Sequence, residues 1–340
     1  MKAELFRAIS AKQVQCMLCA HFCRLKPGER GKCGVRAALA NSGEPFLETL
    51  VHELVAARNV DPIEKKPLYH YLPGSKVYSF GTMGCNLDCA WCQNYNISRH
   101  PAETGQVTGV RVNPTQIVLD ALENACQSIA FTYTEPTVFY ELMIKIADLA
   151  FQKSLGRVLV SNGFQSPDCL KGLESRIDAA NIDLKSFREK TYEKYCSARL
   201  KPVLDNLKTM RNFGWLLEVT TLLIPTINDS DEELRDMTDF IYTELGPDTP
   251  WHISAFRPCR NLINIPPTSL SILNKAAEIG LTRGLNYVYI GNVAQGQSRH
   301  THCPACKKMV ISRNGFQAAP QTGFAGNCPF CKTAIPGIWG

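Results

Sequence analysis

Apolar runs rich in β-branched and aromatic residues recur along the middle of the chain, and each is long enough for one buried strand. The predicted strands are 77–83, 128–134, 157–161, 180–184, 216–224 and 251–256. Amphipathic segments follow these strands and predict helices over 114–125, 136–153, 167–174, 202–212, 231–245 and 269–282. Strands that alternate with helices of this length indicate a parallel sheet with right-handed crossovers.

This alternation predicts an α/β fold, with too few βα units for a closed eight-stranded barrel. The units suit an open, partial (β/α)6 barrel of TIM-like winding, and a doubly wound sheet is the alternative. Both arrangements bind ligands at the carboxyl ends of the strands. Polar residues that belong to a site should therefore follow the predicted strands.

Composition narrows the class of protein. The 340 residues are 45% hydrophobic, which is enough for a substantial core, and the net charge of +6 indicates a solvated surface. The first residues lack an apolar signal stretch, and no segment has the roughly 18 uninterrupted apolar residues that span a bilayer. We therefore expect a soluble, cytoplasmic protein without membrane contact.

The 15 cysteines indicate metal binding, because disulfides are rare in a cytosolic chain. Eleven of them fall into three tight groups. The groups are Cys16, Cys19, Cys23 and Cys33; then Cys85, Cys89 and Cys92; and finally Cys303, Cys306, Cys328 and Cys331. They divide the chain into a cysteine-rich N-terminal module (1–70), a core (71–285) and a C-terminal tail that resembles a zinc ribbon (286–340).

The central group has the spacing Cys-x3-Cys-x2-Cys and follows the first predicted strand. Thiolates select iron–sulfur clusters or zinc. Three ligands leave one iron of a [4Fe–4S] cubane open to a further ligand, as a catalytic cluster requires. The alternative is a zinc site completed by His70 or His100.

The flanking groups each offer four thiolates. Two Cys-x2-Cys knuckles about twenty residues apart predict a structural zinc site in the tail, with an auxiliary iron–sulfur cluster as the alternative. No basic recognition helix follows these knuckles, which disfavours nucleic-acid binding. For the N-terminal group we favour zinc over a second cubane, and His21 could replace one cysteine.

Polar residues do follow the predicted strands. Glu135 ends the second, Asn162 the third, and Asp183 and Lys185 share one face of the fourth. An acid and a base within an apolar strand are costly unless they serve each other or a charged ligand. For Glu135 and Asn162 the simpler interpretations are a helix-terminal carboxylate and turn chemistry.

The central motif resembles the radical S-adenosylmethionine (SAM) superfamily. That resemblance implies that the cluster binds SAM and cleaves it reductively to a 5′-deoxyadenosyl radical. It also implies that Trp91 contacts the adenine and that Glu135 orients the SAM amine, although this chain has Tyr133-Thr134 where the family has two glycines. By similarity to glycyl-radical activating enzymes, including the pyruvate formate-lyase activating enzyme, Asn162, Asp183, Lys185 and His252 would also approach SAM. We assign His252 a catalytic role, with a core histidine as the alternative.

The whole chain, from about Cys16 onward, resembles the AmmeMemoRadiSam system radical SAM enzyme family. The resemblance rests on Cys16-x2-Cys19-x-His21-x-Cys23, Pro27–Arg36, Cys85–Asn94, Tyr133–Thr137, Trp251–Pro258, Tyr287–Val293 and the C-terminal knuckles. This family has no securely implied substrate.

We therefore expect a radical SAM enzyme that abstracts hydrogen from an unidentified substrate, either a small molecule or a protein. The closest alternative is an activase that generates a glycyl radical on a partner protein. An alternative from another class is a zinc-dependent interaction scaffold without catalysis. An enzyme of this kind needs an external electron donor such as flavodoxin or ferredoxin. Cys196 could donate a hydrogen atom, although a buried free thiol is the simpler account.

Overall fold

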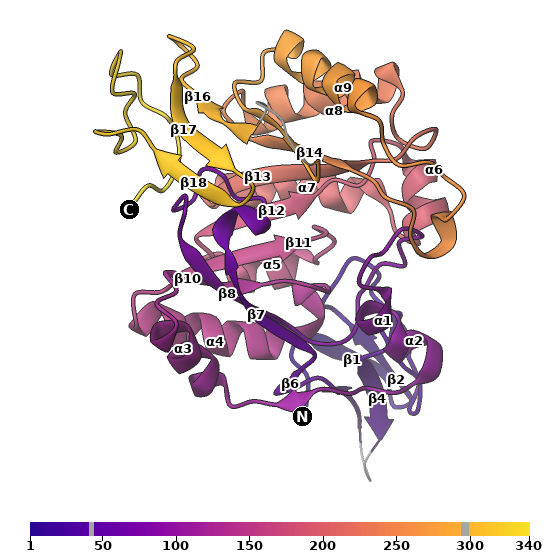
Figure 1. Ribbon diagram of the computed structural model, residues 1–340. Helices are drawn as coiled ribbons and strands as arrows, with labels where there is room; N and C mark the ends of the chain where they lie inside the picture. Colours follow the sequence, from indigo (N-terminus) through magenta and orange to yellow (C-terminus); the bar gives the residue numbers. More distant parts are fainter. Residues whose placement is uncertain (41–43, 294–298) are drawn as a thin grey trace.

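The computed structural model describes residues 1–40, 44–293 and 299–340. Among these residues, eight strands form one central sheet in the order β15-β14-β13-β12-β11-β10-β8-β7 (Figure 1). They are β7 (Ala57–Pro62), β8 (Lys76–Gly81), β10 (Ser128–Phe131), β11 (Gly156–Ser161), β12 (Ala179–Asp183), β13 (Leu216–Leu223), β14 (Trp251–Ala255) and β15 (Val288–Gly291). Neighbouring strands are parallel except β7, which pairs antiparallel with β8. The predicted open α/β fold is thus confirmed.

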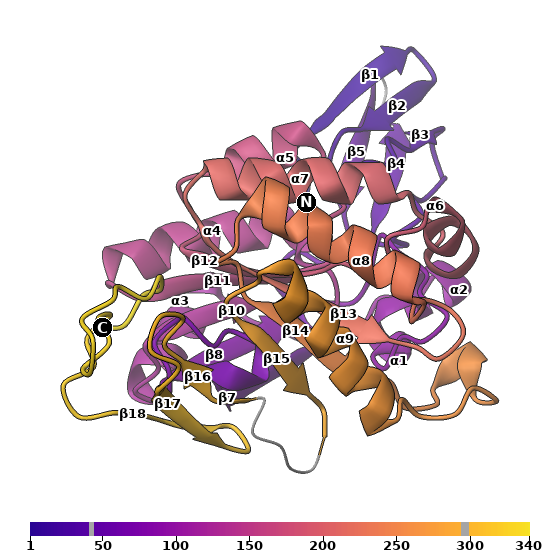
Figure 2. The same cartoon turned by 90° about the horizontal axis from the view of Figure 1, so that it is seen from above.

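Helices connect the parallel strands and pack along one side of the sheet (Figure 2). They are α3 (Pro114–Glu123), α4 (Tyr140–Gln152), α5 (Pro167–Leu173), α6 (Glu189–Thr191), α7 (Leu200–Asn212), α8 (Asp231–Phe240) and α9 (Leu270–Arg283). Asn113, Ser166, Ser230 and Ser269 cap α3, α5, α8 and α9 through side-chain oxygens that accept backbone N–H groups. Within the described ranges, every helix is too short or too polar to cross a lipid bilayer.

The structure departs from the predicted elements in several places. A seventh parallel strand, β15, extends the sheet beyond the six predicted strands. The helix predicted over 136–153 begins as a 3-10 turn at Pro136–Phe139, and the one over 231–245 ends as a π-helical turn at Ile241–Leu245. The strand predicted over 128–134 ends at Phe131, because Tyr133 has a left-handed backbone with φ of 69°.

The N-terminal region forms small sheets beside the core. Its strands are β1 (Phe6–Ser10), β2 (Gln13–Cys16), β3 (Arg24–Leu25), β4 (Arg36–Ala40), β5 (Pro45–Thr49) and β6 (Leu54–Val55). The connection 94–112 contains α1 (Tyr95–Ser98), α2 (His100–Thr104) and β9 (Val110–Arg111), and it packs on this region. The C-terminal tail forms a separate sheet from β16 (Thr301–His302), β17 (Met309–Asn314) and β18 (Gln317–Pro320). The tail and the N-terminal sheets lie on opposite sides of the molecule (Figures 1 and 2).

Candidate functional site

The loop that carries Cys85, Cys89 and Cys92 leaves the carboxyl end of β8 and is held by distant parts of the chain. Asp88 N donates to the carbonyl of Cys196 over 2.9 Å, and Ala90 N donates to the carbonyl of Tyr195 over 2.8 Å. Other elements therefore fix the conformation of the loop, which places its cysteines at the ligand-binding edge of the sheet.

Polar groups point at the sulfur atoms of this loop. Leu87 N donates to Cys85 Sγ over 3.4 Å, and Asn162 Nδ2 lies 3.8 Å from the same sulfur. Ser98 Oγ lies 3.2 Å from Cys92 Sγ. Donors of this kind stabilise thiolate charge, which is the form of cysteine that binds metals.

The surroundings shift the pKa values of Cys85 and Cys89 in opposite directions. Burial, followed by the nearby Glu135 carboxylate, raises the pKa of Cys85. A hydrogen bond from the Cys196 thiol lowers the pKa of Cys89 despite burial, and the Lys185 ammonium acts in the same direction. Cys196, which stands alone in the sequence, therefore lies directly beside the loop and is fully buried.

The three central sulfurs do not form a compact group of the kind that one zinc ion needs. One tetrahedral zinc with Zn–S bonds of 2.3 Å holds its sulfurs about 3.8 Å apart. Among the described residues, only Cys303, Cys306, Cys328 and Cys331 form a group whose ligand atoms all lie within 4.8 Å of one another. Among the described residues, the central cysteines are not part of a group as compact as this one.

Glu135 joins the ends of β10 and β11 from a fully buried position. Its Oε1 accepts hydrogen bonds from Thr137 N, Thr137 Oγ1 and Ser161 Oγ over 3.0, 2.5 and 2.8 Å. Its Oε2 accepts Asn162 N over 2.8 Å and retains capacity for one more donor. Burial raises the pKa of this carboxyl. Glu135 thus caps the following 3-10 turn, and its contact with the SAM amine stays a prediction.

Asn162 links β11 to the cysteine loop. Its Nδ2 donates to Asn86 Oδ1 over 2.7 Å, and its Oδ1 accepts Phe164 N over 3.0 Å. The second bond is the turn chemistry expected of asparagine before glycine, and the first brings the residue to the loop. The turn interpretation of Asn162 is therefore realised, and its approach to SAM stays a prediction.

Tyr133 occupies the place where the family has a glycine, and it adopts the backbone that glycine favours. Its φ is 69°, a conformation that is costly for a bulky residue. The Tyr133 hydroxyl donates to Asp61 Oδ2 over 3.0 Å, and the Lys66 ammonium lies 4.7 Å from the ring centre. These contacts hold the left-handed conformation, so the turn is kept without the glycines.

Asp183 and Lys185 form the predicted pair at the end of β12, with Lys185 Nζ 2.6 Å from Asp183 Oδ2. Burial disfavours the ammonium, but the Asp183 carboxylate and the Cys89 thiol outweigh it and raise the pKa of Lys185. The positive charge of Lys185 therefore lies beside the cysteine loop.

His252 lies away from this group, inside the curve of the sheet. Its Nε2 is 2.5 Å from Glu218 Oε2, and the rings of Tyr69 and Tyr289 pack against it. The Glu218 carboxylate is fully buried and also accepts Tyr69 N and His70 N. Burial raises the pKa of Glu218, but the hydrogen bond from His252 outweighs it, and the net pKa is lowered. His252 therefore has a strong structural partner, and its catalytic role stays a prediction.

Trp91 is buried on the cysteine loop, with its ring centre 6.2 Å from that of Tyr195. Its indole Nε1 has no hydrogen-bond partner among the described residues. A buried N–H without an acceptor is costly, which suits a position that a bound ligand completes.

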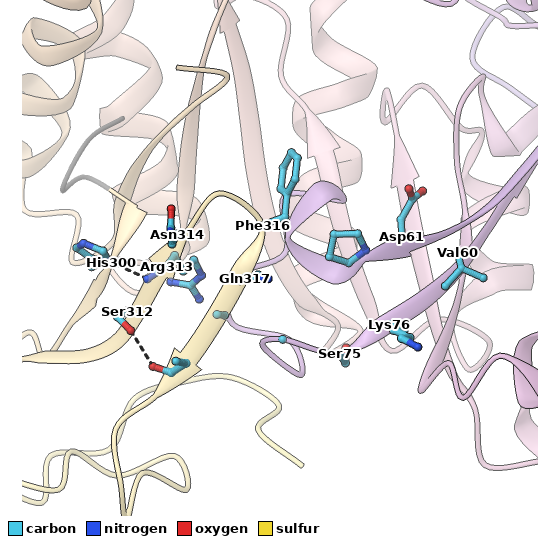
Figure 3. Close-up of a pocket in the computed structure, with 14 residues that line it drawn as sticks. Val60, Asp61, Ser75, Lys76, His300, Ser312, Arg313, Asn314, Phe316 and Gln317 are labelled. Carbon is cyan, nitrogen blue, oxygen red and sulfur yellow. Dashed lines mark hydrogen bonds between the residues drawn. The ribbon is translucent and has the colours of Figure 1, made fainter. Parts of the chain in front are cut away.

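Several cavities lie outside the cysteine loop, and two of them lie near the tail or the strand ends. The first, of 810 Å³, opens between β7 and the C-terminal hairpin and is lined by Asp61, Lys76, Arg313 and Phe316 among others (Figure 3). The second, of 380 Å³, is lined by Thr220, His252, Ser254, Arg257, Asn292 and Phe316 among others. The second cavity adjoins the carboxyl ends of β13 to β15, where the fold class places ligands.

Several residues that contact the loop were missing from the sequence prediction. Ser98 and Asn86 carry no recognisable pattern, and Arg260 lies far away in the sequence. Arg260 Nη1 donates to Asp88 Oδ1 and to the Cys89 carbonyl, both over 2.7 Å. The one sequence signal for Arg260 was its place as a charged residue after the last predicted strand.

Several known proteins resemble this chain in sequence or in fold. Residues 80–241 match the Radical SAM superfamily. An uncharacterised protein of Methanocaldococcus jannaschii is 37% identical over 317 residues, covering 93% of this chain and 92% of that protein. Another protein of that organism, proposed to be a glycyl-radical enzyme activating enzyme, is 27% identical over 68% of this chain and 84% of its own length. The structure of Streptococcus suis SuiB bound to S-adenosylmethionine is similar in fold, with a TM-score of 0.51 and 13% identity over 68% of this chain and 53% of that chain.

Proposed function

Because this chain belongs to the radical SAM superfamily, we propose that it cleaves SAM reductively and abstracts a hydrogen atom from a substrate. The observation that carries the proposal is the three-cysteine loop at the carboxyl edge of the sheet. A [4Fe–4S] cluster held by Cys85, Cys89 and Cys92 would supply the electron that splits the sulfonium of SAM into methionine and a 5′-deoxyadenosyl radical. The remaining residues of the chain bind, orient and shield the reactants.

The polar groups around the loop would hold its thiolates in place. The amide of Leu87, the amide group of Asn162 and the hydroxyl of Ser98 each approach a cysteine sulfur. Hydrogen bonds to sulfur also help to set the reduction potential of iron–sulfur sites. These residues would therefore tune how readily the site accepts an electron from flavodoxin, ferredoxin or a similar donor.

Four side chains at the strand ends are proposed to position SAM. The free capacity of Glu135 Oε2 suits an ammonium group, and Asn162 lies directly beside it. Asp183, about one-third exposed, and Lys185 offer an acceptor and a donor for the polar groups of the nucleoside and the methionine. The unpaired Trp91 indole suits a contact near the adenine.

The substrate would enter the cavity that His252 lines. We propose that His252 acts there as a hydrogen-bonding group, held in one orientation by Glu218. Arg257 and Asn292 also line this cavity, which suits a polar substrate. A volume of 380 Å³ accommodates a small molecule or one extended side chain of a protein.

Glycyl-radical activation of a partner protein is the second candidate, favoured by the 27% identity to a proposed activating enzyme. The motifs quoted above also support membership of the AmmeMemoRadiSam system family. We further propose that Cys303, Cys306, Cys328 and Cys331 bind structural zinc. Their sulfurs lie 3.5 Å (Cys303 to Cys331) and 3.7 Å (Cys306 to Cys328) apart, near the spacing around one tetrahedral ion.

The loop is tested by replacing all three of its cysteines with alanine. The purified, anaerobically reconstituted variant should form no 5′-deoxyadenosine from SAM under dithionite, because no cluster remains to deliver the electron. The matched control, Cys303→Ala with Cys306→Ala, should retain that activity while losing zinc. SAM cleavage by the triple variant would refute the proposal, and zinc without iron in the wild type would favour a scaffold.

The nature of the substrate is tested by deuterium transfer. Extracts from cells grown in deuterated medium are separated into small molecules and proteins and added with SAM and dithionite. Deuterium in 5′-deoxyadenosine from the protein fraction would favour the activase, and deuterium from the small-molecule fraction would favour the cavity as the substrate site.

A further inference from the structure

The four N-terminal cysteines form a second group of thiols, of which Cys16 and Cys33 are buried and Cys19 and Cys23 are partly exposed. Cys16 ends β2, and its N–H donates to the carbonyl of Cys23 over 2.9 Å. A side chain begun at Gly31 would meet two of the sulfurs, with its Cβ 3.7 Å from Cys33 Sγ and 3.8 Å from Cys23 Sγ. Turns between short strands therefore gather these cysteines into one place, as a metal site requires.

The spacing of this group differs from that of the tail. The C-terminal sulfurs all lie within 4.8 Å of one another, whereas no three N-terminal sulfurs do so in the described part of the chain. A single tetrahedral zinc requires sulfurs about 3.8 Å apart. Four thiolates that surround a wider centre suit a cubane, in which each sulfur binds a different iron.

We infer that Cys16, Cys19, Cys23 and Cys33 hold a second [4Fe–4S] cluster, in place of the zinc that the sequence favours for this group. All four irons of such a cluster have a protein ligand, so it offers no position to SAM. It serves electron transfer or stability, in contrast to the open site at the central loop.

A buried cation lies against this group. The Arg36 side chain is 1% exposed, and its Nη1 lies 3.6 Å from Cys16 Sγ. Its Nη2 pairs with Glu141, while its Nε has no partner among the described residues. A guanidinium beside a four-thiolate cluster offsets part of the negative charge that the cluster brings into the protein interior.

The N-terminal cysteine-rich region also packs directly against the central cysteine loop. His21 Nε2 lies 2.8 Å from the carbonyl of Asn86, the residue after the first central cysteine. Gly84 has a φ of 98°, and a Cβ there would meet Val35 at 2.7 Å and the Cys33 carbonyl at 3.1 Å. The two groups of cysteines therefore share a tightly packed boundary.

The test uses the full-length chain in which Cys85, Cys89 and Cys92 are all alanine. After anaerobic reconstitution, this variant should keep about half of the wild-type iron and labile sulfide. It should also give an electron paramagnetic resonance signal under dithionite that SAM does not change. The wild type should contain about one zinc per chain, from the tail alone.

The complementary variant replaces Cys19 and Cys23 with alanine. It should lose the SAM-insensitive signal and keep the SAM-responsive one, with circular dichroism confirming that it is folded. A triple variant without iron, together with about two zinc ions per wild-type chain, would overturn the inference. If only this inference fails, SAM still changes the electron paramagnetic resonance signal of the wild type. If the proposed function fails, SAM changes no signal of the wild type.

Discussion

The buried imidazole of His70 should make the attachment of the C-terminal tail depend on pH. His70 Nδ1 lies 2.7 Å from the Pro336 carbonyl, so it must donate, and Nε2 then accepts the Tyr289 hydroxyl over 2.7 Å. The Tyr289 hydroxyl also forms a hydrogen bond with Thr301 Oγ1, which in turn accepts a hydrogen bond from Arg313 Nη1. In this arrangement the imidazole is neutral, because a protonated Nε2 cannot accept.

The magnitude follows from the shift in the pKa of His70. Burial lowers this pKa from 6.5 to about 4. In the unfolded chain the imidazole takes up a proton as the pH falls below about 6.5, whereas in the folded protein it resists until about 4. Stability is therefore complete above the unfolded pKa and is lost as the pH falls toward the folded pKa. The full shift is worth about 3 kcal/mol, and about 2 kcal/mol of it should disappear between pH 7 and pH 5.

Urea unfolding of the wild type and of His70→Asn at both pH values measures this effect. Asparagine keeps a donor for the Pro336 carbonyl and does not titrate. On lowering the pH from 7 to 5, the wild type should lose about 2 kcal/mol more free energy of unfolding than the variant. The control, His100→Asn at a half-buried position, should behave as the wild type does. Equal losses in the wild type and His70→Asn would refute the reasoning.

Three further substitutions probe other contacts. Glu218→Gln should lower the free energy of unfolding in urea at pH 7 by about 3–5 kcal/mol, because it removes the charge of a buried carboxylate that accepts several hydrogen bonds. The control, Glu232→Gln at an exposed position, should lower it by less than about 0.5 kcal/mol. Similar losses in the two variants would contradict the structural role of Glu218. Tyr133→Phe should cost about 1 kcal/mol by the same assay, through its lost hydroxyl bond to β7, and an unchanged stability would count against that bond. Ser98→Ala should make the reduction potential of the SAM-responsive signal more negative in a redox titration, because a donor to sulfur is lost. No change in that potential would show that the hydroxyl does not act on the site.

The parts of the fold that could be predicted from the sequence are those that leave a local pattern. The six long apolar strands and the capped helices α3, α5, α8 and α9 repeat the periodicity of their own segments. Strand β15 has four residues, of which the first and last are only partly buried, whereas all four residues of β10 are buried. Strand β7 is mostly exposed and reads as polar, because it lies at the edge of the sheet. Both depend on neighbouring strands more than on their own sequence.

In the candidate site, too, residues with a local sequence pattern could be predicted and residues placed by distant contacts could not. Motif spacing located the cysteines, and the strand-end rule located Glu135, Asn162 and the pair at the end of β12. Spacing along the chain says little about spacing in space, so it could not distinguish the compact tail sulfurs from the wider N-terminal group. The left-handed Tyr133 likewise depends on Asp61, which is 72 residues away in the sequence. Contacts of that range have no local signal.

The antiparallel edge strand β7 has a consequence for how the protein behaves at high concentration. Unpaired amides along a sheet edge are a template for strands of other molecules. Here the edge carries Pro62, which has no N–H to offer, and Asp61, whose pKa is raised by burial but lowered to about 2 overall by hydrogen bonds from Lys65 and Lys66. This buried carboxylate is charged at any physiological pH and holds the ammonium of Lys65, which is 45% exposed, so an incoming strand would have to strip water from that charge. The same ion pairs that hold Tyr133 therefore also discourage copies of the protein from aggregating through this edge.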